Sequence, residues 1–171
     1  NHAVTRFLEP LLASHNHDHF EIFAFAELKI EDAATLRYKT YVDHWVNTTG
    51  MSDDVLAKHI QALGIDILVD LAGHTKGHRL PVFARKPTPI SISWLGYGYT
   101  TGLSAIDYYL TNSVMVPAGS EHLFSETPWR LKGVSTAYRP AQGMGVVGCL
   151  PASKRGFITF GSLTRAVRIN H

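Results

Sequence analysis

The sequence has few of the features on which several classes of protein depend. It has one cysteine, Cys149, in 171 residues, so it can form neither an internal disulfide bond nor a site with several thiolate ligands. No apolar run approaches the roughly 20 residues that a membrane-spanning helix requires. The net charge is only +2, and no basic block indicates nucleic-acid binding. We therefore expect a globular domain from a reducing compartment, the cytoplasm, with neither a membrane nor a nucleic acid as partner.

Two motifs of nucleotide-dependent and metal-dependent enzymes are also missing. No G-x-G-x-x-G follows the first predicted strand, which argues against a dinucleotide-binding fingerprint, and no D-x-D-like motif offers a metal site. Ten histidines are present, and His15, His17 and His19 alternate along one stretch. Because they lie between a predicted helix and a predicted strand, they do not converge from different elements as metal ligands do. We predict solvated loop residues there.

Helical and strand patterns alternate along most of the chain. Apolar spacing predicts helices over residues 3–14, 31–41 and 52–63, and strands over residues 20–26, 42–46, 65–71, 90–95 and 107–111. Pro10 lies inside the first helical pattern, where it is expected to kink the helix or mark its first turn. The alternation predicts a Rossmann-like α/β domain, with a parallel sheet covered on both faces.

The predicted strand over residues 65–71 is the element around which the other predictions are arranged. It is short and rich in Ile, Leu and Val, as is typical of a buried parallel strand. It leads into a polar, glycine-flanked loop, residues 73–79, and the strand over residues 90–95 leads into residues 95–102. Ligands of open α/β sheets bind beyond the carboxyl ends of the strands. These two loops are therefore the predicted site.

The carboxyl-terminal part of the chain is less regular. Residues 129–131 predict a short edge strand, residues 141–156 a linker, and residues 157–162 a new strand. We therefore predict a domain over residues 1–150 and the start of a second one over 151–171. The chain begins without Met and stops within a pattern, so we expect it to be a piece of a longer polypeptide.

Several segments with fixed spacing resemble one family of enzymes. The matching stretches are residues 66–77, 85–102 and 160–170, and the pieces that carry the match read ILVDLAGHTKGHR (67–79), FARKPTPISISWLGY (83–97), TTGLSAIDYYLT (100–111) and FGSLTRAVRIN (160–170). They resemble the catalytic region of glycosyltransferase family 41, the protein O-linked N-acetylglucosamine transferases, particularly bacterial members attached to tetratricopeptide repeats. The resemblance implies the two-domain GT-B fold. This chain would then be its Rossmann-like amino-terminal half plus the first strand of the second half.

The resemblance also implies roles for individual residues. His2 matches the histidine that opens the family's amino-terminal catalytic domain and lies near the donor phosphates and the acceptor; an imidazole there can exchange a proton at neutral pH. Leu95, Gly96 and Tyr97 match the loop beside the sugar. The family commonly has proline after this tyrosine, whereas this chain has Gly98.

Four further residues complete the predicted site. His74 and Thr75 lie at the end of the strand over residues 65–71, where they can hydrogen-bond the donor or the acceptor. By resemblance, Arg168 takes the place of a lysine that contacts the diphosphate, and a fixed cation stabilises the leaving UDP without a metal. Arg165 takes the place of a glutamine near the nucleotide.

Two arginines near the predicted site allow a purely structural interpretation. Arg79 adds positive charge close to the place where a diphosphate or a peptide would bind. Alternatively, Arg79 and Arg85 brace the fold by pairing with Asp66, Asp70 or Asp107.

The resemblance implies a metal-independent and cofactor-free enzyme. Its reaction would transfer N-acetylglucosamine from UDP-GlcNAc to Ser or Thr hydroxyls of proteins, with inversion at the anomeric carbon. The expected partners are a protein or peptide acceptor, a nucleotide sugar and tetratricopeptide repeats in the same full-length chain. Two alternatives remain open: a related transferase that uses another nucleotide sugar, such as UDP-glucose or GDP-fucose, and a catalytically degenerate peptide-binding domain. We do not expect the 171 residues alone to be active.

Overall fold

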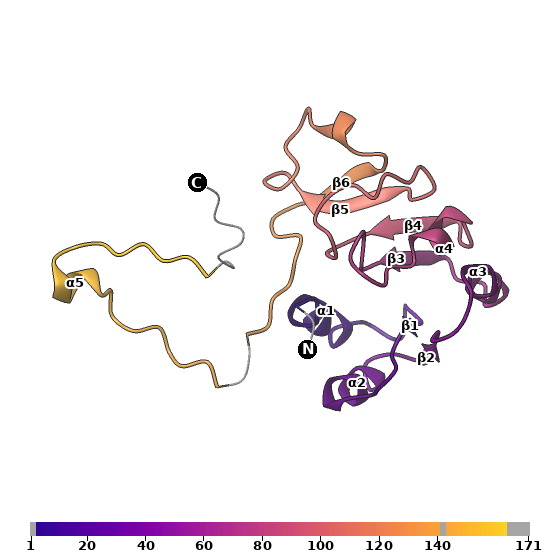
Figure 1. Cartoon of the computed structure of the whole chain (residues 1–171), viewed down its shortest axis with the longest axis horizontal. Helices are drawn as coiled ribbons and strands as arrows, with labels where there is room; N and C mark the ends of the chain where they lie inside the picture. Colours follow the sequence, from indigo (N-terminus) through magenta and orange to yellow (C-terminus); the bar gives the residue numbers. More distant parts are fainter. Residues whose placement is uncertain (1–2, 141–142, 164–171) are drawn as a thin grey trace. The chain divides into compact units, whose positions relative to one another are not determined.

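The computed structural model describes residues 3–140 and 143–163 (Figure 1). The chain divides into one unit that ends at Pro140 and a second that begins at Ala141. The regular elements of the first unit are α1 (Thr5–Leu12), β1 (Phe23–Ala26), α2 (Ala33–Lys39), β2 (His44–Asn47), α3 (Asp53–Ala62), β3 (Ile67–Asp70), α4 (Leu80–Ala84), β4 (Ile90–Ser93), β5 (Tyr108–Asn112), the 3-10 turn η1 (Glu121–Leu123) and β6 (Thr127–Leu131). No helix in the described ranges is both long and apolar enough to cross a membrane.

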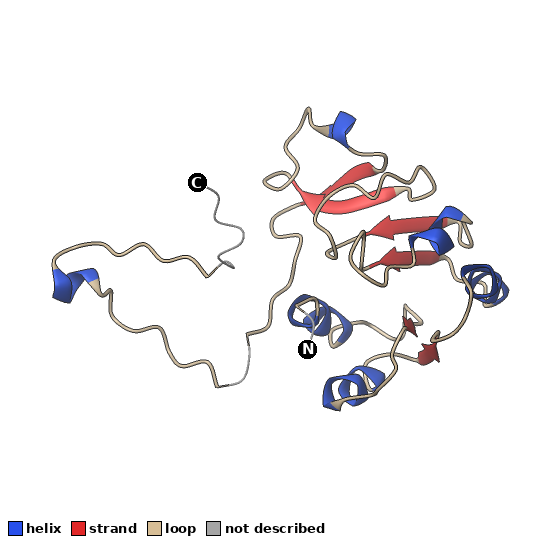
Figure 2. Ribbon diagram, in the orientation of Figure 1, coloured by secondary structure: helices blue, strands red, loops and turns tan. Residues whose placement is uncertain are grey.

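All strand pairs in the structure are parallel, which confirms the predicted α/β class. The pairs form two sheets rather than one: β1 pairs with β2, and β3 to β6 form a four-stranded sheet in that order. Figure 2 shows the four strands side by side, and α4 packs with Leu68 of β3 in the core. Strand β6 lies at the outer edge, so the prediction of an edge strand over residues 129–131 is confirmed, with two more residues at its start.

Helix α3 supplies much of the core. Its N-cap is Ser52, whose hydroxyl accepts a hydrogen bond from the backbone N–H of Val55 at 3.3 Å, and Asp53 and Asp54 place negative charge at the positive helix end. One face of the helix is buried and packs into a cluster with residues of β3, α4 and the segment before β5. The cluster comprises Leu56, Ala57, Ile60, Leu68, Leu80, Val82, Phe83 and Ile106.

The expectation that residues 65–71 form a fully buried strand is wrong. Strand β3 buries Leu68 and Asp70, but Ile67 and Val69 are 49% and 42% exposed. Alternate side chains of a strand point to opposite faces, and only the face of Leu68 packs against the core cluster.

Helix α1 continues through Pro10, so this proline marks neither its start nor its first turn. Two contacts attach the helix to distant parts of the same unit. The Phe7 ring packs against Tyr138 with ring centroids 5.5 Å apart. The buried carboxylate of Glu9 accepts hydrogen bonds from the Arg37 guanidinium at 2.6 and 3.0 Å.

The second unit contradicts one prediction, the strand over residues 157–162. The predicted linker holds a one-turn helix, α5 (Ala152–Arg155), which ends at Gly156 with φ of +74°. The strand predicted over residues 157–162 is absent, because those residues adopt no regular structure and their apolar side chains are exposed. A strand requires a hydrogen-bonded neighbour, and no strand is present among residues 143–163 to provide one.

Candidate functional site

The carboxyl ends of β3 and β4 are joined by a buried carboxylate. Asp70, the last residue of β3, accepts hydrogen bonds from the backbone N–H of Ala72 at 3.1 Å and of Gly73 at 3.0 Å. It also accepts one at 3.1 Å from the hydroxyl of Ser93, the last residue of β4. Asp70 is 4% exposed and Ser93 is 5% exposed. The carboxylate therefore folds the loop after β3 back over the end of its own strand.

The loops after β3 and β4 touch through their backbones. A Cβ atom built on Gly96 would lie 2.5 Å from the carbonyl oxygen of Leu71, and one built on Gly73 would lie 2.5 Å from Cβ of Tyr97. Leu95 adopts a positive φ of 69°, which is uncommon for a residue with a side chain. The close approach accounts for glycine at both positions and aims Tyr97 outward, where it is 57% exposed.

His74 connects the same two loops by a side-chain hydrogen bond. Its Nε2–H donates to the carbonyl of Thr101 at 2.8 Å, since a carbonyl oxygen can only accept. In the neutral ring Nδ1 is then left as an acceptor. The edge of the imidazole meets the Tyr97 ring with centroids 5.4 Å apart and an interplanar angle of 78°. Because both side chains are exposed, the site offers a ligand one aromatic and one imidazole surface.

A second buried carboxylate anchors the far end of the 95–102 loop. Glu126, which precedes β6 and is 3% exposed, accepts hydrogen bonds from the hydroxyls of Thr100 and Thr101 and from the backbone N–H of Thr101. Thr101 is the residue whose carbonyl receives His74. The loop is therefore held at both ends, with its glycine-rich middle facing solvent.

The structure brings together five of the predicted site residues: His74, Thr75, Leu95, Gly96 and Tyr97. Thr75 has a local role, because its hydroxyl donates to the carbonyl of Ala72 at 2.7 Å and closes the turn. The other three predicted residues lie outside the described ranges; these are His2, Arg165 and Arg168.

Two carboxylates shape the site, and sequence reasoning named Asp70 only as a possible ion-pair partner and did not name Glu126. Asp70 had a usable signal, because an acidic residue at the end of an apolar strand is expected to find a specific partner. Glu126 had none, since it lies 26 and 25 residues from Thr100 and Thr101, the threonines it binds.

The arginines near the site brace the fold, but not with the predicted partners. Arg79 binds Glu27 at 2.7 Å and Asp53 at 2.8 Å, and Arg85 binds Asp54 at 2.5 Å. The expected acceptors are engaged elsewhere, as Asp70 binds backbone N–H groups and Ser93. Helix α3 presents its amino-terminal acids toward α4, which makes Asp53 and Asp54 the nearer partners.

The prediction of solvated histidines is confirmed for His17 and His19, which are exposed in the loop after α1. The Nδ1 atom of His17 lies 3.1 Å from the Asp43 carboxylate, whereas His15 Nδ1 bonds back to the carbonyl of Leu11 at 3.0 Å. The three rings therefore have separate surroundings.

Sequence comparison identifies a matching family model, that of glycosyl transferase family 41, over residues 1–132. Curated relatives include a probable UDP-N-acetylglucosamine–peptide N-acetylglucosaminyltransferase SPINDLY of Oryza sativa subsp. japonica. It is 35% identical over 172 residues, which cover 98% of this chain and 19% of the rice protein. The probable transferase SEC of Arabidopsis thaliana is 34% identical over 128 residues, or 74% of this chain and 13% of that protein.

A solved structure is also similar, the K341M mutant of the Thermobaculum terrenum O-GlcNAc transferase. It superposes with a TM-score of 0.79 at 34% identity, over 83% of this chain and 27% of that one. At this identity and coverage, the likeness confirms the GT-B catalytic-region fold class. The chain spans about a fifth of the length of the curated relatives.

Proposed function

Because the chain belongs to glycosyltransferase family 41, we propose that it is part of an inverting glycosyltransferase that moves N-acetylglucosamine from UDP-GlcNAc to Ser or Thr hydroxyls of proteins. The chain supplies the acceptor-side half of the catalytic region, and the remainder of the full-length protein supplies most of the nucleotide site. We also propose cytoplasmic location, tetratricopeptide repeats in the same polypeptide, and turnover without a metal ion.

One observation carries the proposal: the loops that follow β3 and β4 converge on an exposed imidazole and an exposed tyrosine at the carboxyl edge of a parallel sheet. Ligands of open α/β sheets bind at this edge. The same loops contain the segments that resemble the family. The names of the curated relatives support UDP-GlcNAc as the donor and a peptide as the acceptor, because those proteins are named UDP-N-acetylglucosamine–peptide N-acetylglucosaminyltransferases.

The roles proposed for single residues follow from the chemistry of the reaction. Attack by a hydroxyl on the anomeric carbon releases UDP, and Arg168 would neutralise the charge that develops on its diphosphate. Arginine keeps a fixed positive charge but presents a planar fork in place of the point charge of lysine. His2, His74 and Tyr97 would line the sugar and the acceptor, and Arg165 would lie near the nucleotide.

The test is sugar transfer by the full-length protein, offered radiolabelled UDP-GlcNAc, UDP-glucose and GDP-fucose separately, with protein from a lysate as acceptor. We expect labelling from UDP-GlcNAc, undiminished by EDTA. Labelling from another donor alone would retain the mechanism and change the substrate. A folded protein that turns over no donor would support the degenerate peptide-binding alternative.

The Arg168→Ala variant of the same protein should lose transfer by about 100-fold or more, as when a group that stabilises transition-state charge is removed. Arg168→Lys is the matched control and should recover a substantial part of the activity. Equal activity of all three proteins would remove Arg168 from the mechanism.

A further inference from the structure

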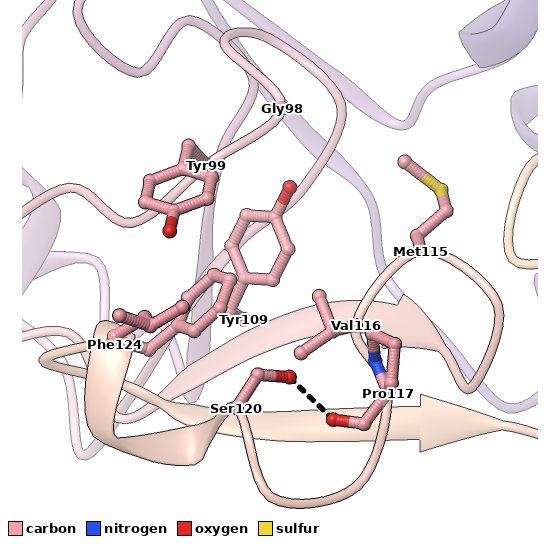
Figure 3. A pocket seen from close by; sticks show the side chains of 9 residues that line it. Gly98, Tyr99, Tyr109, Met115, Val116, Pro117, Ser120 and Phe124 are labelled. Atoms are coloured by element: carbon pink, nitrogen blue, oxygen red, sulfur yellow. Dashed lines mark hydrogen bonds between the residues drawn. The ribbon is translucent and has the colours of Figure 1, made fainter.

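A small cavity lies next to the candidate site, between the 95–102 loop and the segment that follows β5 (Figure 3). Its volume is about 150 Å³. It is lined by Gly98, Tyr99, Tyr109, Met115, Val116, Pro117, Ser120, Leu123 and Phe124. Tyr109 and Val116 are 4% and 5% exposed, whereas Tyr99, Met115 and Leu123 are 46%, 56% and 47% exposed. The cavity therefore has a buried floor and a rim of exposed apolar side chains.

Three aromatic rings form one wall of the cavity. The Phe124 ring centroid lies 5.1 Å from that of Tyr99 and 5.1 Å from that of Tyr109. The backbone next to Tyr99 is held in place, since the hydroxyl of Thr100 donates to buried Glu126 at 2.7 Å. The wall is thus anchored by the network that positions the candidate site.

No hydrogen bond from the Tyr109 hydroxyl is found within the described part of the chain. The residue as a whole is 4% exposed, but the only enclosed side-chain atom without a partner in the described ranges is Oγ1 of Thr111, so the Tyr109 hydroxyl reaches solvent at the cavity. Figure 3 shows its side chain rising from β5 with the hydroxyl directed toward the loop at Gly98. Burial, followed by the nearby charge of Glu126, raises the pKa of Tyr109 above its ordinary value. The phenol therefore stays protonated at neutral pH, and it can donate a hydrogen bond to a ligand that replaces water in the cavity.

The chemistry of the lining excludes a charged ligand. None of the lining side chains is ionised at neutral pH, and the nearest acids are already bound: Glu126 to the threonines, and Glu121 to Arg130 at 2.5 Å. A diphosphate would require cationic or backbone N–H donors. Engineered apolar cavities of about 150 Å³ bind benzene, so this one accommodates a single apolar side chain.

We propose that the cavity binds one apolar side chain of the acceptor polypeptide, with the Tyr109 hydroxyl donating to an adjacent peptide carbonyl. The inference rests on the proposed function. Its location supports a polypeptide occupant, because Gly98 lines the cavity and directly follows Tyr97 of the candidate site. A peptide that delivers its hydroxyl to the site would pass an apolar, aromatic rim of the kind that anchors side chains in protein interfaces.

The experiment measures acceptor selectivity of the full-length protein with its active donor. A Ser-containing peptide is varied one position at a time to Ala, Leu, Pro or Phe. At one position near the serine, an apolar residue of fitting size should lower KM roughly tenfold relative to Ala, with kcat little changed. In Tyr99→Ala the apolar peptide and the Ala peptide should have similar KM values. Tyr109→Phe should raise KM a few-fold for every peptide, because it removes one hydrogen bond.

Val114→Ala is the matched control, because Val114 is 87% exposed and next to Met115 but does not line the cavity. It should keep the wild-type selectivity, and Met115→Ala should weaken it. Donor hydrolysis without peptide is measured on each variant. If Tyr99→Ala raises the donor KM instead, the cavity binds the sugar nucleotide and the proposal is overturned.

Failure of this proposal can be told apart from failure of the proposed function. Transfer with no preference at any peptide position would retain the transferase and reject the side-chain cavity. If no donor is turned over, the same peptides are titrated by calorimetry. If the Kd depends on the size of the peptide side chain and Tyr99→Ala removes this dependence, the proposal that the cavity binds a side chain is supported. If the Kd does not depend on side-chain size, the proposal is rejected.

Discussion

The backbone N–H of Arg139 donates to the carbonyl of Arg6 at 2.9 Å, which is the carbonyl that Pro10 leaves without its usual helical donor. In an α-helix the N–H of residue 10 would bond to the carbonyl of residue 6, and proline has no N–H. The proline in α1 thus frees a carbonyl to which the segment that follows β6 is hydrogen-bonded. Arg139 adds its side chain near Glu9, with 3.7 Å between the charged atoms.

This relationship predicts different effects for two substitutions of Arg139. Arg139→Ala keeps the backbone N–H and should change the free energy of unfolding by less than about 0.5 kcal/mol, because the Arg139 side chain is 49% exposed and Glu9 keeps its hydrogen bonds to Arg37. Arg139→Pro removes the N–H and should cost about 1 kcal/mol or more. Urea unfolding measures both. Equal costs would show that the side chain, rather than the backbone bond, attaches the segment.

The buried bond between Asp70 and Ser93 can be measured with a double-mutant cycle. Asp70→Ala, Ser93→Ala and the double variant are compared by chemical unfolding, and the coupling energy should be about 1.5–3 kcal/mol, typical of a hydrogen bond to a charged group. The bond lies at the carboxyl ends of β3 and β4. A coupling near zero would mean that Asp70 acts only through the backbone N–H groups of Ala72 and Gly73.

Two glycines of the 95–102 loop should respond to substitution for different reasons. Gly96→Ala forces a methyl group to within 2.5 Å of the backbone of residues 71 and 72, so we expect a loss of about 3 kcal/mol or more. Gly98→Ala meets no atom within 4 Å, and its φ of +79° should cost about 1–2 kcal/mol. Thermal and urea unfolding give the comparison. A Gly98→Ala variant that loses more than Gly96→Ala would contradict the close approach of the two loops.

Gly98 also stands where the family commonly has proline. Proline is locked near φ of −65°, and the loop here needs +79°. Gly98→Pro should therefore rearrange the loop that carries Tyr97, and transfer by the full-length protein should fall more than it does in Gly98→Ala. Unchanged activity in Gly98→Pro would show that the loop adopts the family's shape in the working enzyme.

Glu9 should make stability depend on pH in the acid range. The hydrogen bond from Arg37 is the main cause that holds the pKa of Glu9 below its ordinary value of 4.5, while burial opposes the shift. A carboxyl with a lowered pKa contributes stability that is complete above its unfolded pKa and lost as the pH falls through its folded pKa. Wild type should therefore exceed Glu9→Gln in stability at pH 7, and the difference should shrink below about pH 4.5.

The measurement is urea unfolding of both proteins at pH 7, 5, 4 and 3, with Glu31→Gln as control. Glu31 also forms an ion pair, with Lys39 at 2.5 Å, but its side chain is 44% exposed. Its variant should differ little from wild type at every pH. A Glu9→Gln difference that persists unchanged to pH 3 would contradict the lowered pKa.

Much of the fold could be read from the order of the residues. Periodic apolar spacing located α1, α2 and α3, and Ser52 with its two acids marked the start of α3, because these signals are local. Short apolar runs located β1 to β5. The fixed spacing of the WLGY and TTG segments pointed to the family and to the loops around His74 and Tyr97, since residues next to each other in sequence remain next to each other in the loop.

Tertiary structure alone decided what depends on distant contacts. The strands form two sheets, one face of β3 is exposed, and residues 157–162 do not form a strand. These outcomes could not be predicted locally, because strand pairing and burial depend on neighbours that are distant in sequence. Tertiary structure brought Glu126 to Thr101 and Tyr109 to Phe124, and so built the loop anchor and the cavity wall. Residue type determined which groups can donate, accept or pack, and only the folded chain determined which of them meet.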